Sequence, residues 1–276
     1  MDTKIKQFCA CVWDHYAANK RDFSWRQTTD PYYIIVSEIM LQQTQTQRVQ
    51  EKIDAFVELF PTWQALASAQ RGDVIVAWQG LGYNRRAAYL HASAQHVARE
   101  FACVLPHCPK ALTVLPGIGI NTAGAICAYA FNMPTAFIET NIRTVFIYHF
   151  FPDVLVVSDA MILEFVQKTV CKDNPREWYY ALMDYGVHLK KTRGNIAKKS
   201  KHYAKQSAFI GSMRQIRGSI IRILSSAENR TLSRNDLIDR VCDDVGCSLV
   251  DCTKIIKNLA SEELITIDTV VDCVHV

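Results

Sequence analysis

The chain has 276 residues, of which 49% are hydrophobic and 21% charged, and its formal net charge is +4. This is the composition of an ordinary soluble globular protein, and the length suffices for two domains. No run of about 18 uncharged apolar residues occurs, and the opening segment MDTKIKQFCACVWDHY carries charges throughout. We therefore expect neither a membrane span nor a secretory signal.

The apolar pattern is helical along most of the chain. Apolar residues recur at three- and four-residue spacing, which is typical of amphipathic helices. The segments are 5–18, 34–49, 51–60, 63–69, 73–78, 86–98, 122–131, 141–150, 159–170 and 176–189. No alternating strand pattern appears before residue 260, so the sequence predicts an all-α body.

The pattern changes at about residue 212. A helix over 213–226 is expected first, and Ser233 and Ser248 are plausible N-caps for helices over 234–243 and 249–260. Two short β-prone runs follow, LITID and TVVDCVHV. Three helices and a terminal hairpin predict a winged-helix-like module.

Charge is distributed unevenly. Residues 185–227 hold ten Lys or Arg and no acidic residue, whereas 228–276 carry five basic and ten acidic residues. The basic run is either a solvated helix face or a phosphate-facing surface, and its density of cations favours the second. The acidic module would be repelled by phosphates, so we favour packing or protein contact for it over DNA recognition.

The cysteines lie at 9, 11, 103, 108, 127, 171, 242, 247, 252 and 273. In a chain of this size without a signal sequence, such scattered cysteines are expected to be reduced thiols in the cytosol. The later group has a five-residue spacing that does not place thiols on one helix face, and it contains no CxxC pair. We therefore expect no metal site there.

Two segments carry candidate chemistry. In LPGIG, Gly117 and Gly119 allow the backbone to approach an anion and to direct its N–H groups at it from the start of a helix. In PYYIIVSEIMLQQTQ, Glu38 stands among apolar residues. If it is buried, its pKa rises toward neutrality, which suits a general acid. The alternative is a glutamate on the polar side of its helix.

Four segments together resemble the adenine DNA glycosylases of the helix-hairpin-helix (HhH-GPD) superfamily. They are FSWR at 23–26, SEIMLQQTQ at 37–45, WQGLGYNRRAAYL at 78–90 and LPGIGINTAGAI at 115–126. The resemblance implies an all-α, two-lobed HhH-GPD glycosylase domain over 1–211 and a winged-helix-like module over 212–276. The six-helix lobe would span about 31–131, and the second lobe would combine 1–30 with 132–211.

The resemblance also implies the chemistry of base excision repair. A hydrolase of this class flips a damaged or mispaired base out of the duplex and hydrolyses its N-glycosidic bond. Glu38 would protonate the leaving base, and Glu139 would stabilise the oxocarbenium-like sugar much as in glycosidases. Asn141 would orient the catalytic carboxylate or water. Gln43 would fill the gap in the duplex, with Tyr83 as a wedge.

DNA binding is implied at further positions. The amides at Gly117 and Gly119 would hold a phosphate, with a monovalent cation sharing the hairpin carbonyls. Lys198, Lys199 and Lys201 of the basic run would also contact phosphates. The expected partner is double-stranded DNA carrying a lesion or mismatch, bound by a monomer in the cytoplasm and associated with the nucleoid. The acidic module is available for a protein contact.

The sequence departs from its relatives at several positions. Asn121 stands where strand-cleaving relatives carry a lysine, so no Schiff base forms and we expect no lyase activity. No cysteine lies between 171 and 242, so no [4Fe–4S] cluster is expected in the region where relatives bind one. Glu139 replaces an aspartate and is one methylene longer.

The base to be excised stays open at this point. No domain resembling the 8-oxoguanine-recognition domain of adenine glycosylases follows the catalytic region. Adenine is the first expectation, and uracil or thymine in mismatches or another modified base are alternatives. A DNA-binding protein that recognises damage without chemistry is the competing hypothesis.

Overall fold

A computed structural model describes residues 2–276, which form two compact units. Unit 1 combines the described residues up to Glu38 with Pro106–Val114 and Ile118–Lys205. Unit 2 combines Ile39–Leu105 with Leu115–Gly117 and Gln206–Val276. No described helix is long and apolar enough to cross a membrane. The domain boundaries that we predicted at residues 131 and 211 stay predictions.

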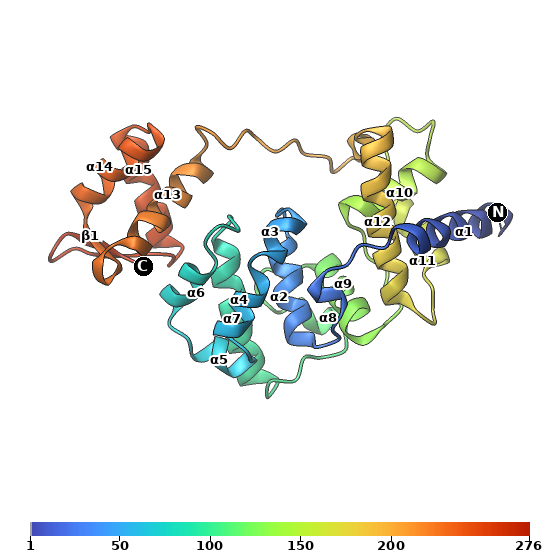
Figure 1. Cartoon of the computed structure of the whole chain (residues 1–276), viewed down its shortest axis with the longest axis horizontal. Helices are drawn as coiled ribbons and strands as arrows, with labels where there is room; N and C mark the ends of the chain where they lie inside the picture. The colour runs from blue at the N-terminus through green and yellow to red at the C-terminus, as the bar shows by residue number, and fades with distance from the viewer. Residues whose placement is uncertain (1) are drawn as a thin grey trace. The chain divides into compact units, whose positions relative to one another are not determined.

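Unit 1 is helical throughout. Its elements are α1 (Asp2–Asn19), η1 (Ser24–Arg26), most of α2 (Pro31–Leu41), α8 (Pro109–Leu112), α9 (Ile120–Phe131), α10 (Thr140–Phe150), α11 (Asp159–Thr169), α12 (Pro175–Arg193) and η2 (Ile196–Lys199). Helix α12 packs against both α10 and α1 (Figure 1). The core between these helices is rich in aromatic side chains, among them Phe8, Phe146 and Trp178.

Two glycines allow close packing in unit 1. A β-carbon at Gly186 would lie 2.6 Å from the carbonyl oxygen of Asn141, so α12 can cross the start of α10 only where it has no side chain. A β-carbon at Gly124 on α9 would lie 2.9 Å from the Cβ of Phe137. The segment that leads into α10 is thereby held against α9.

Unit 2 contains two sets of elements. The first set is α3 (Thr46–Gln50), α4 (Ile53–Leu59), α5 (Trp63–Ser68), α6 (Arg71–Ala77) and α7 (Arg85–Glu100). The second set is α13 (Met213–Ser226), η3 (Glu228–Arg230), β1 (Thr231–Ser233), α14 (Arg234–Val245), α15 (Leu249–Ser261), β2 (Thr266–Asp268) and β3 (Cys273–His275).

The second set has the predicted winged-helix-like order. Helices α13, α14 and α15 pack together beside a small sheet (Figure 1). The side chains of Ser233 and Ser248 cap α14 and α15, as predicted. Each hydroxyl oxygen accepts a hydrogen bond of 3.1 Å from the backbone N–H three residues further along the chain. The sheet has the antiparallel order β1–β3–β2. Strand β1 was missed because three residues before a helix are too few to show alternation.

The predicted helix over 34–49 is wrong as a single element. Helix α2 ends at Leu41, α3 begins at Thr46, and Gln43 between them has a left-handed φ of 57°. The guanidinium of Arg86 donates hydrogen bonds of 2.6–2.9 Å to the carbonyls of Ile39, Met40 and Gln42. Carbonyls at the end of a helix need hydrogen-bond donors, and Arg86 supplies them here, so the helix can end without a further turn. Periodicity alone carries no sign of such a distant donor.

Candidate active site

Two carboxyl groups form the centre of the candidate site, and both belong to unit 1. Glu38 lies on α2 with 9% of its surface exposed, and Glu139 is the N-cap residue of α10. Burial raises the pKa of Glu38 well above its usual range, and the nearby Glu139 raises it further. Glu38 is therefore on the buried side of its helix, as the general-acid hypothesis requires.

Glu139 is more accessible than Glu38 and has a positive charge nearby. Its side chain lies deep among neighbouring atoms, although part of its surface stays accessible. Burial raises its pKa to about 7, while the positive charge of Arg143 opposes this shift. The N-terminus of α10 adds a partial positive charge at the same place. The charge of Glu139 raises the pKa of Glu38, so Glu139 loses its proton first, at about pH 7, and Glu38 keeps its proton to higher pH.

Two tyrosines line the carboxyl pair. The rings of Tyr129 and Tyr180 stack with their centroids 4.6 Å apart and their planes 6° apart. Burial is the main cause that raises the pKa of both hydroxyls, and the charge of Glu38 contributes to each. Sequence analysis missed both tyrosines because they fit the ordinary apolar pattern of α9 and α12.

An ion pair supports this aromatic stack. Arg26 lies over the ring of Tyr180, 4.5 Å from its centroid, and donates to both carboxylate oxygens of Asp184 at 2.8 and 2.9 Å. Asp184 also accepts from Arg21 at 2.6 Å. A buried aspartate with two arginine partners is well compensated. Arg26 is the last residue of FSWR, so one of the segments that carry the family resemblance contains a residue that supports the site.

Asn141, which was predicted for catalysis, and Asn121, which was predicted for the base pocket, belong to the same unit as the carboxyl pair. The Oδ1 atom of Asn121 accepts a hydrogen bond from the N–H of Ile138, which precedes Glu139. The Nδ2 atom of Asn141 lies 4.0 Å from the sulfur of Met183. Within residues 2–276, no hydrogen bond joins the Asn141 side chain to either carboxyl group. Its role in orienting the carboxylate or water stays a prediction.

The glycines of the hairpin differ from each other. Gly117 has a left-handed φ of 77°, and a β-carbon there would lie 2.9 Å from the ring of Tyr89. Gly119 has an ordinary φ of −84°, so its backbone conformation does not require glycine. A β-carbon at Gly119 would have no other atom within 4 Å. Phosphate binding by both residues stays a prediction.

The carbonyls of the hairpin already have partners. The Gly117 oxygen accepts from Gln42 Nε2 at 3.2 Å, and the Pro116 oxygen accepts from Ser93 Oγ at 3.1 Å. Each carbonyl keeps one further lone pair that could face a monovalent cation. The monovalent cation expected from the resemblance stays a prediction.

The part of the basic run that contains the three predicted lysines follows α12 in unit 1. Val157 N–H donates to the Lys199 carbonyl at 2.8 Å, and Lys201 N–H donates to the Val157 carbonyl at 2.9 Å. The Lys199 ammonium donates to the carbonyl of Pro152, whereas Lys198 and Lys201 are exposed. Backbone pairing and the buried Ala197 hold this segment. Two of the three predicted phosphate ligands are therefore free to contact solvent.

Three of the later cysteines come together, although their spacing does not place them on one face of a helix. The sulfurs of Cys242, Cys247 and Cys252 lie within 4.8 Å of one another, and those of Cys242 and Cys247 are 3.7 Å apart. The spacing was judged on a single helix, whereas α14, the following turn and α15 each supply one thiol. A [4Fe–4S] cluster takes four cysteine thiolates, so this group of three does not fit one.

Comparison with known proteins identifies the superfamily of the chain. Residues 36–173 match the HhH-GPD superfamily of base excision DNA repair proteins. An adenine DNA glycosylase of Mycolicibacterium smegmatis is 31% identical over 232 residues, covering 76% of this chain and 77% of that protein. One from Mycobacterium tuberculosis is 40% identical over 131 residues, covering 47% of this chain and 43% of that protein.

Solved structures show the same fold. A thermostable thymine-DNA glycosylase has a TM-score of 0.63 at 24% identity, covering 72% of this chain and 93% of that one. A trapped endonuclease III–DNA intermediate has a TM-score of 0.57 at 14% identity, covering 77% and 92%. The chain therefore belongs to the HhH-GPD superfamily of base excision DNA repair proteins, and the predicted mostly helical glycosylase fold is confirmed.

Proposed function

We propose that this protein is a DNA glycosylase that removes a mispaired adenine by hydrolysing its N-glycosidic bond. One observation carries the proposal: the buried carboxyl group of Glu38 has the half-buried carboxyl group of Glu139 as its neighbour, and the charge of Glu139 helps to raise the pKa of Glu38. Such a pair supplies an acid and an anion at the same pH. A DNA-binding protein without chemistry has no need of either.

The roles follow from the protonation states. Glu38 donates its proton to a ring nitrogen of the base, which then departs as a neutral molecule with the electrons of the glycosidic bond. The Glu139 carboxylate then stabilises the cationic sugar by its negative charge. Water adds to the anomeric carbon and gives a proton to the Glu38 carboxylate, which restores the acid and leaves an abasic site. The stacked Tyr129 and Tyr180 limit the access of bulk water to Glu38.

Asn121 supports a monofunctional reaction. An amide is not a nucleophile, so it cannot form the Schiff base that a strand-cleaving lyase needs. Its oxygen is moreover engaged by Ile138. We therefore propose that the product is an intact strand with an abasic site, which breaks only on later treatment with alkali.

Adenine is favoured by the leaving-group chemistry and by the relatives. Purine ring nitrogens accept a proton, which suits a buried neutral Glu38. The relatives from both mycobacteria are named adenine DNA glycosylases. Uracil, thymine or another modified base in a mismatch is the alternative.

A panel of labelled duplexes tests this function. Each duplex carries one mismatch or lesion, including adenine opposite guanine and opposite 8-oxoguanine, and is incubated with the protein and then with alkali. We expect cleavage of the duplexes that carry a mispaired adenine, and only after the alkali treatment. Cleavage of another duplex would reassign the base, cleavage without alkali would overturn the monofunctional assignment, and tight binding with no cleavage of any duplex would refute the enzyme.

A further inference from the structure

Three thiols of the winged-helix-like module meet at the turn between α14 and α15. The sulfurs of Cys242, Cys247 and Cys252 all lie within 4.8 Å of one another, and those of Cys242 and Cys247 are 3.7 Å apart. Among the side chains that the structure describes, this is the only group of three or more histidine, cysteine or acidic residues placed to hold a metal ion. Cysteine thiolates are ligands for zinc and for softer cations.

Local backbone motifs bring the three positions together. Gly246 ends α14 in the left-handed conformation, with a φ of 68°, and its N–H donates to the Cys242 carbonyl at 2.8 Å. A turn of this kind commonly places the residue after the glycine, here Cys247, against that same helical residue. Cys247 also directly precedes the N-cap Ser248, and a residue at that position often packs against the fourth residue of the helix, here Cys252.

These motifs account for the closeness of the positions but not for their chemistry. Each contact needs only an apolar side chain on either side of the turn, so residues without sulfur would serve equally well. Here all three positions carry a free thiol. The 3.7 Å between the sulfurs of Cys242 and Cys247 is far longer than the roughly 2.05 Å of a disulfide bond. The turn therefore presents three reduced sulfurs to a common point.

The spacing of the sulfurs fits a zinc ion. Zn–S bonds of about 2.3 Å in a tetrahedral arrangement place two sulfurs about 3.8 Å apart. The separation of 3.7 Å between Cys242 and Cys247 is already close to this value. The sulfur of Cys252 lies within 4.8 Å of both, so it needs to move by at most about 1 Å. Three protein ligands leave the fourth position of the ion to a water molecule, as in open zinc sites.

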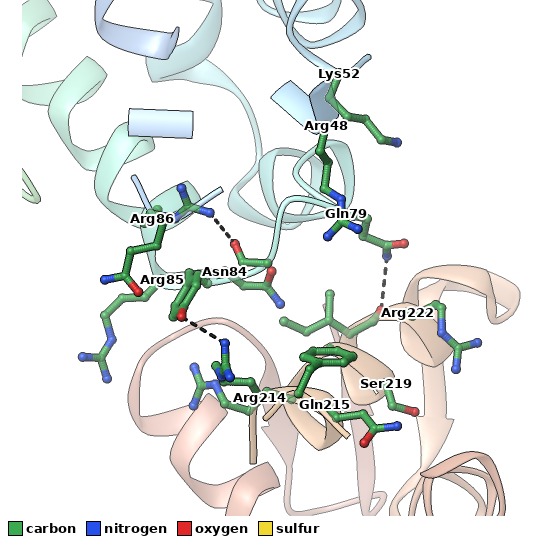
Figure 2. Close-up of a pocket in the computed structure, with 18 of the residues that line it drawn as sticks. Arg48, Lys52, Gln79, Asn84, Arg85, Arg86, Arg214, Gln215, Ser219 and Arg222 are labelled. Carbon is green, nitrogen blue, oxygen red and sulfur yellow. Dashed lines mark hydrogen bonds between the residues drawn. The ribbon is translucent and has the colours of Figure 1, made fainter. Parts of the chain in front are cut away.

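The end of α14 that carries the group is fixed against α13. The Asp244 carboxylate accepts hydrogen bonds from the side chains of Ser219, at 2.5 Å, and of Arg222, and Figure 2 shows both donors on this helix. They line a pocket of about 950 Å³ that α13 shares with the loop preceding α7. The helix end is therefore held in place before any ion binds, which lowers the ordering cost of forming the site.

The surroundings admit a cation. Cys242 and Cys247 are partly exposed, so an ion can reach the group from solvent, whereas Cys252 is fully buried. Residues 228–276 carry ten acidic and five basic residues, a balance that repels phosphates but attracts a metal ion. The partial positive charge at the N-terminus of α15 offsets part of the charge of three thiolates. Burial raises the pKa of Cys252 to about 12, so without an ion this thiol is neutral, and the ion displaces its proton.

We propose that Cys242, Cys247 and Cys252 bind one Zn²⁺ ion, which joins the end of α14 to the start of α15. Three S–H protons pass to the buffer and three Zn–S bonds form, with no oxidation or reduction. Such a site was not expected from the cysteine spacing along one helix. The three cysteines belong to unit 2 and the carboxyl pair to unit 1, so the ion has no part in the proposed base excision. Its effect is to hold the turn between the two helices.

Zinc uptake by the full-length protein tests the site. The protein is freed of metal with a chelator, kept reduced with a reductant that contains no thiol, and titrated with zinc chloride against a chromophoric chelator. Metal analysis after gel filtration gives the amount retained. We expect one tightly bound zinc ion per chain. A fully reduced protein that retains no zinc would overturn the proposal.

Cysteine variants assign the ligands. Cys242→Ser and, separately, Cys247→Ser are each expected to weaken zinc binding at least about tenfold, because each removes one of three thiolates. Both side chains are partly exposed, so serine is tolerated at either position. Cys273→Ser is the matched control, because Cys273 is a partly exposed cysteine of the same module outside the group. Equal zinc affinities of Cys247→Ser and Cys273→Ser would refute the inference.

Two further measurements locate the ion. Co²⁺ added in place of Zn²⁺ is expected to give thiolate-to-metal charge-transfer absorption, and this absorption is expected to weaken in Cys247→Ser. Zinc is also expected to slow amide hydrogen exchange about tenfold in peptides from residues 242–256, with no change in peptides around Trp178 of unit 1. Zinc bound without these effects would lie elsewhere and overturn the inference.

A redox pair is the alternative use of these thiols. It is tested by counting free thiols before and after exposure of the metal-free protein to air. We expect zinc to bind the reduced protein and to protect Cys242 and Cys247 from oxidation. A reduced protein that takes up no zinc, but loses two thiols in air and keeps them in Cys247→Ser, would indicate a disulfide-forming pair and overturn the metal assignment.

Discussion

The side-chain oxygen of Asn121, at the start of α9, accepts a hydrogen bond from the backbone N–H of Ile138 at 3.1 Å. Ile138 directly precedes Glu139, so the amide fixes the segment that carries the second carboxylate. The resemblance implies a catalytic lysine at this position in strand-cleaving relatives. In this protein, Asn121 at that position instead holds the backbone next to Glu139 in place.

Removal of this amide is expected to slow base release without weakening DNA binding. Asn121→Ala leaves the Ile138 N–H without its partner and lets Glu139 shift, and a displacement on the order of an ångström can cost about a hundredfold in rate. We expect the single-turnover rate to fall at least about tenfold, with duplex affinity within about threefold. Asn174→Ala is the control, because it removes a similar bond to the N–H of Glu177 at α12. Equal rates for both variants would refute a positioning role.

Glu38 is expected to be indispensable for chemistry. Glu38→Gln keeps the shape of the side chain but cannot donate the proton, and general acids contribute about a hundredfold to ten-thousandfold to rate. We expect base release to fall about a thousandfold while binding to an abasic-analogue duplex changes less than about threefold. Glu164→Gln, an exposed glutamate of α11, serves as the control. Normal excision by Glu38→Gln would show that this glutamate is only structural.

The pH dependence of base release follows from the two carboxyl groups. Burial raises the pKa of Glu139 to about 7 and that of Glu38 well above its usual range. The active form has Glu38 protonated and Glu139 ionised. The rate is therefore expected to fall as pH drops below about 7, when Glu139 is neutralised, and to fall again at higher pH as Glu38 ionises. Single-turnover rates across this range measure both limbs, and a rate independent of pH would contradict the assignment.

The basic run is expected to contribute to affinity without sequence preference. Replacing Lys198, Lys199 and Lys201 by alanine should lower the slope of log affinity against log salt by about two units, because Lys199 is partly engaged by Pro152. The weakening is expected to be the same for all duplex sequences. Lys6→Ala with Lys172→Ala provides a control of similar charge change. An unchanged slope in the triple variant would mean that the run does not contact DNA.

The convergence of three thiols has a consequence for stability. Cys252 is fully buried, and burial raises the pKa of its thiol, so it is a neutral apolar side chain in the native protein without bound metal. Cys252→Ser places a hydroxyl in the same space, and we expect a loss of about 1–3 kcal/mol in the free energy of unfolding. Cys273→Ser, at a partly exposed position, is expected to be nearly neutral. Urea unfolding of both variants makes the comparison, and equal stabilities would contradict it.

Local features of the fold were predictable from the sequence. Helix α13 has the predicted bounds, and Ser233 and Ser248 cap the helices that follow them. These features depend on residues a few positions apart, so composition and spacing are enough to indicate them. The burial of Glu38 was also suggested by its apolar neighbours, although the alternative of an exposed position could not be decided from them.

Long-range features were decided only by the tertiary structure. The break at Gln43 depends on Arg86, and the support of Glu139 depends on Asn121, each of them far along the chain from the segment it fixes. The pocket requires α13 to face a loop that precedes it by more than a hundred residues. The sequence by itself determined most of the helices and the superfamily, and it pointed to the two acids as candidates. Packing decided which donors, thiols and cations come together. Such contacts leave no periodic pattern in the sequence of either segment, so they could not be predicted from it.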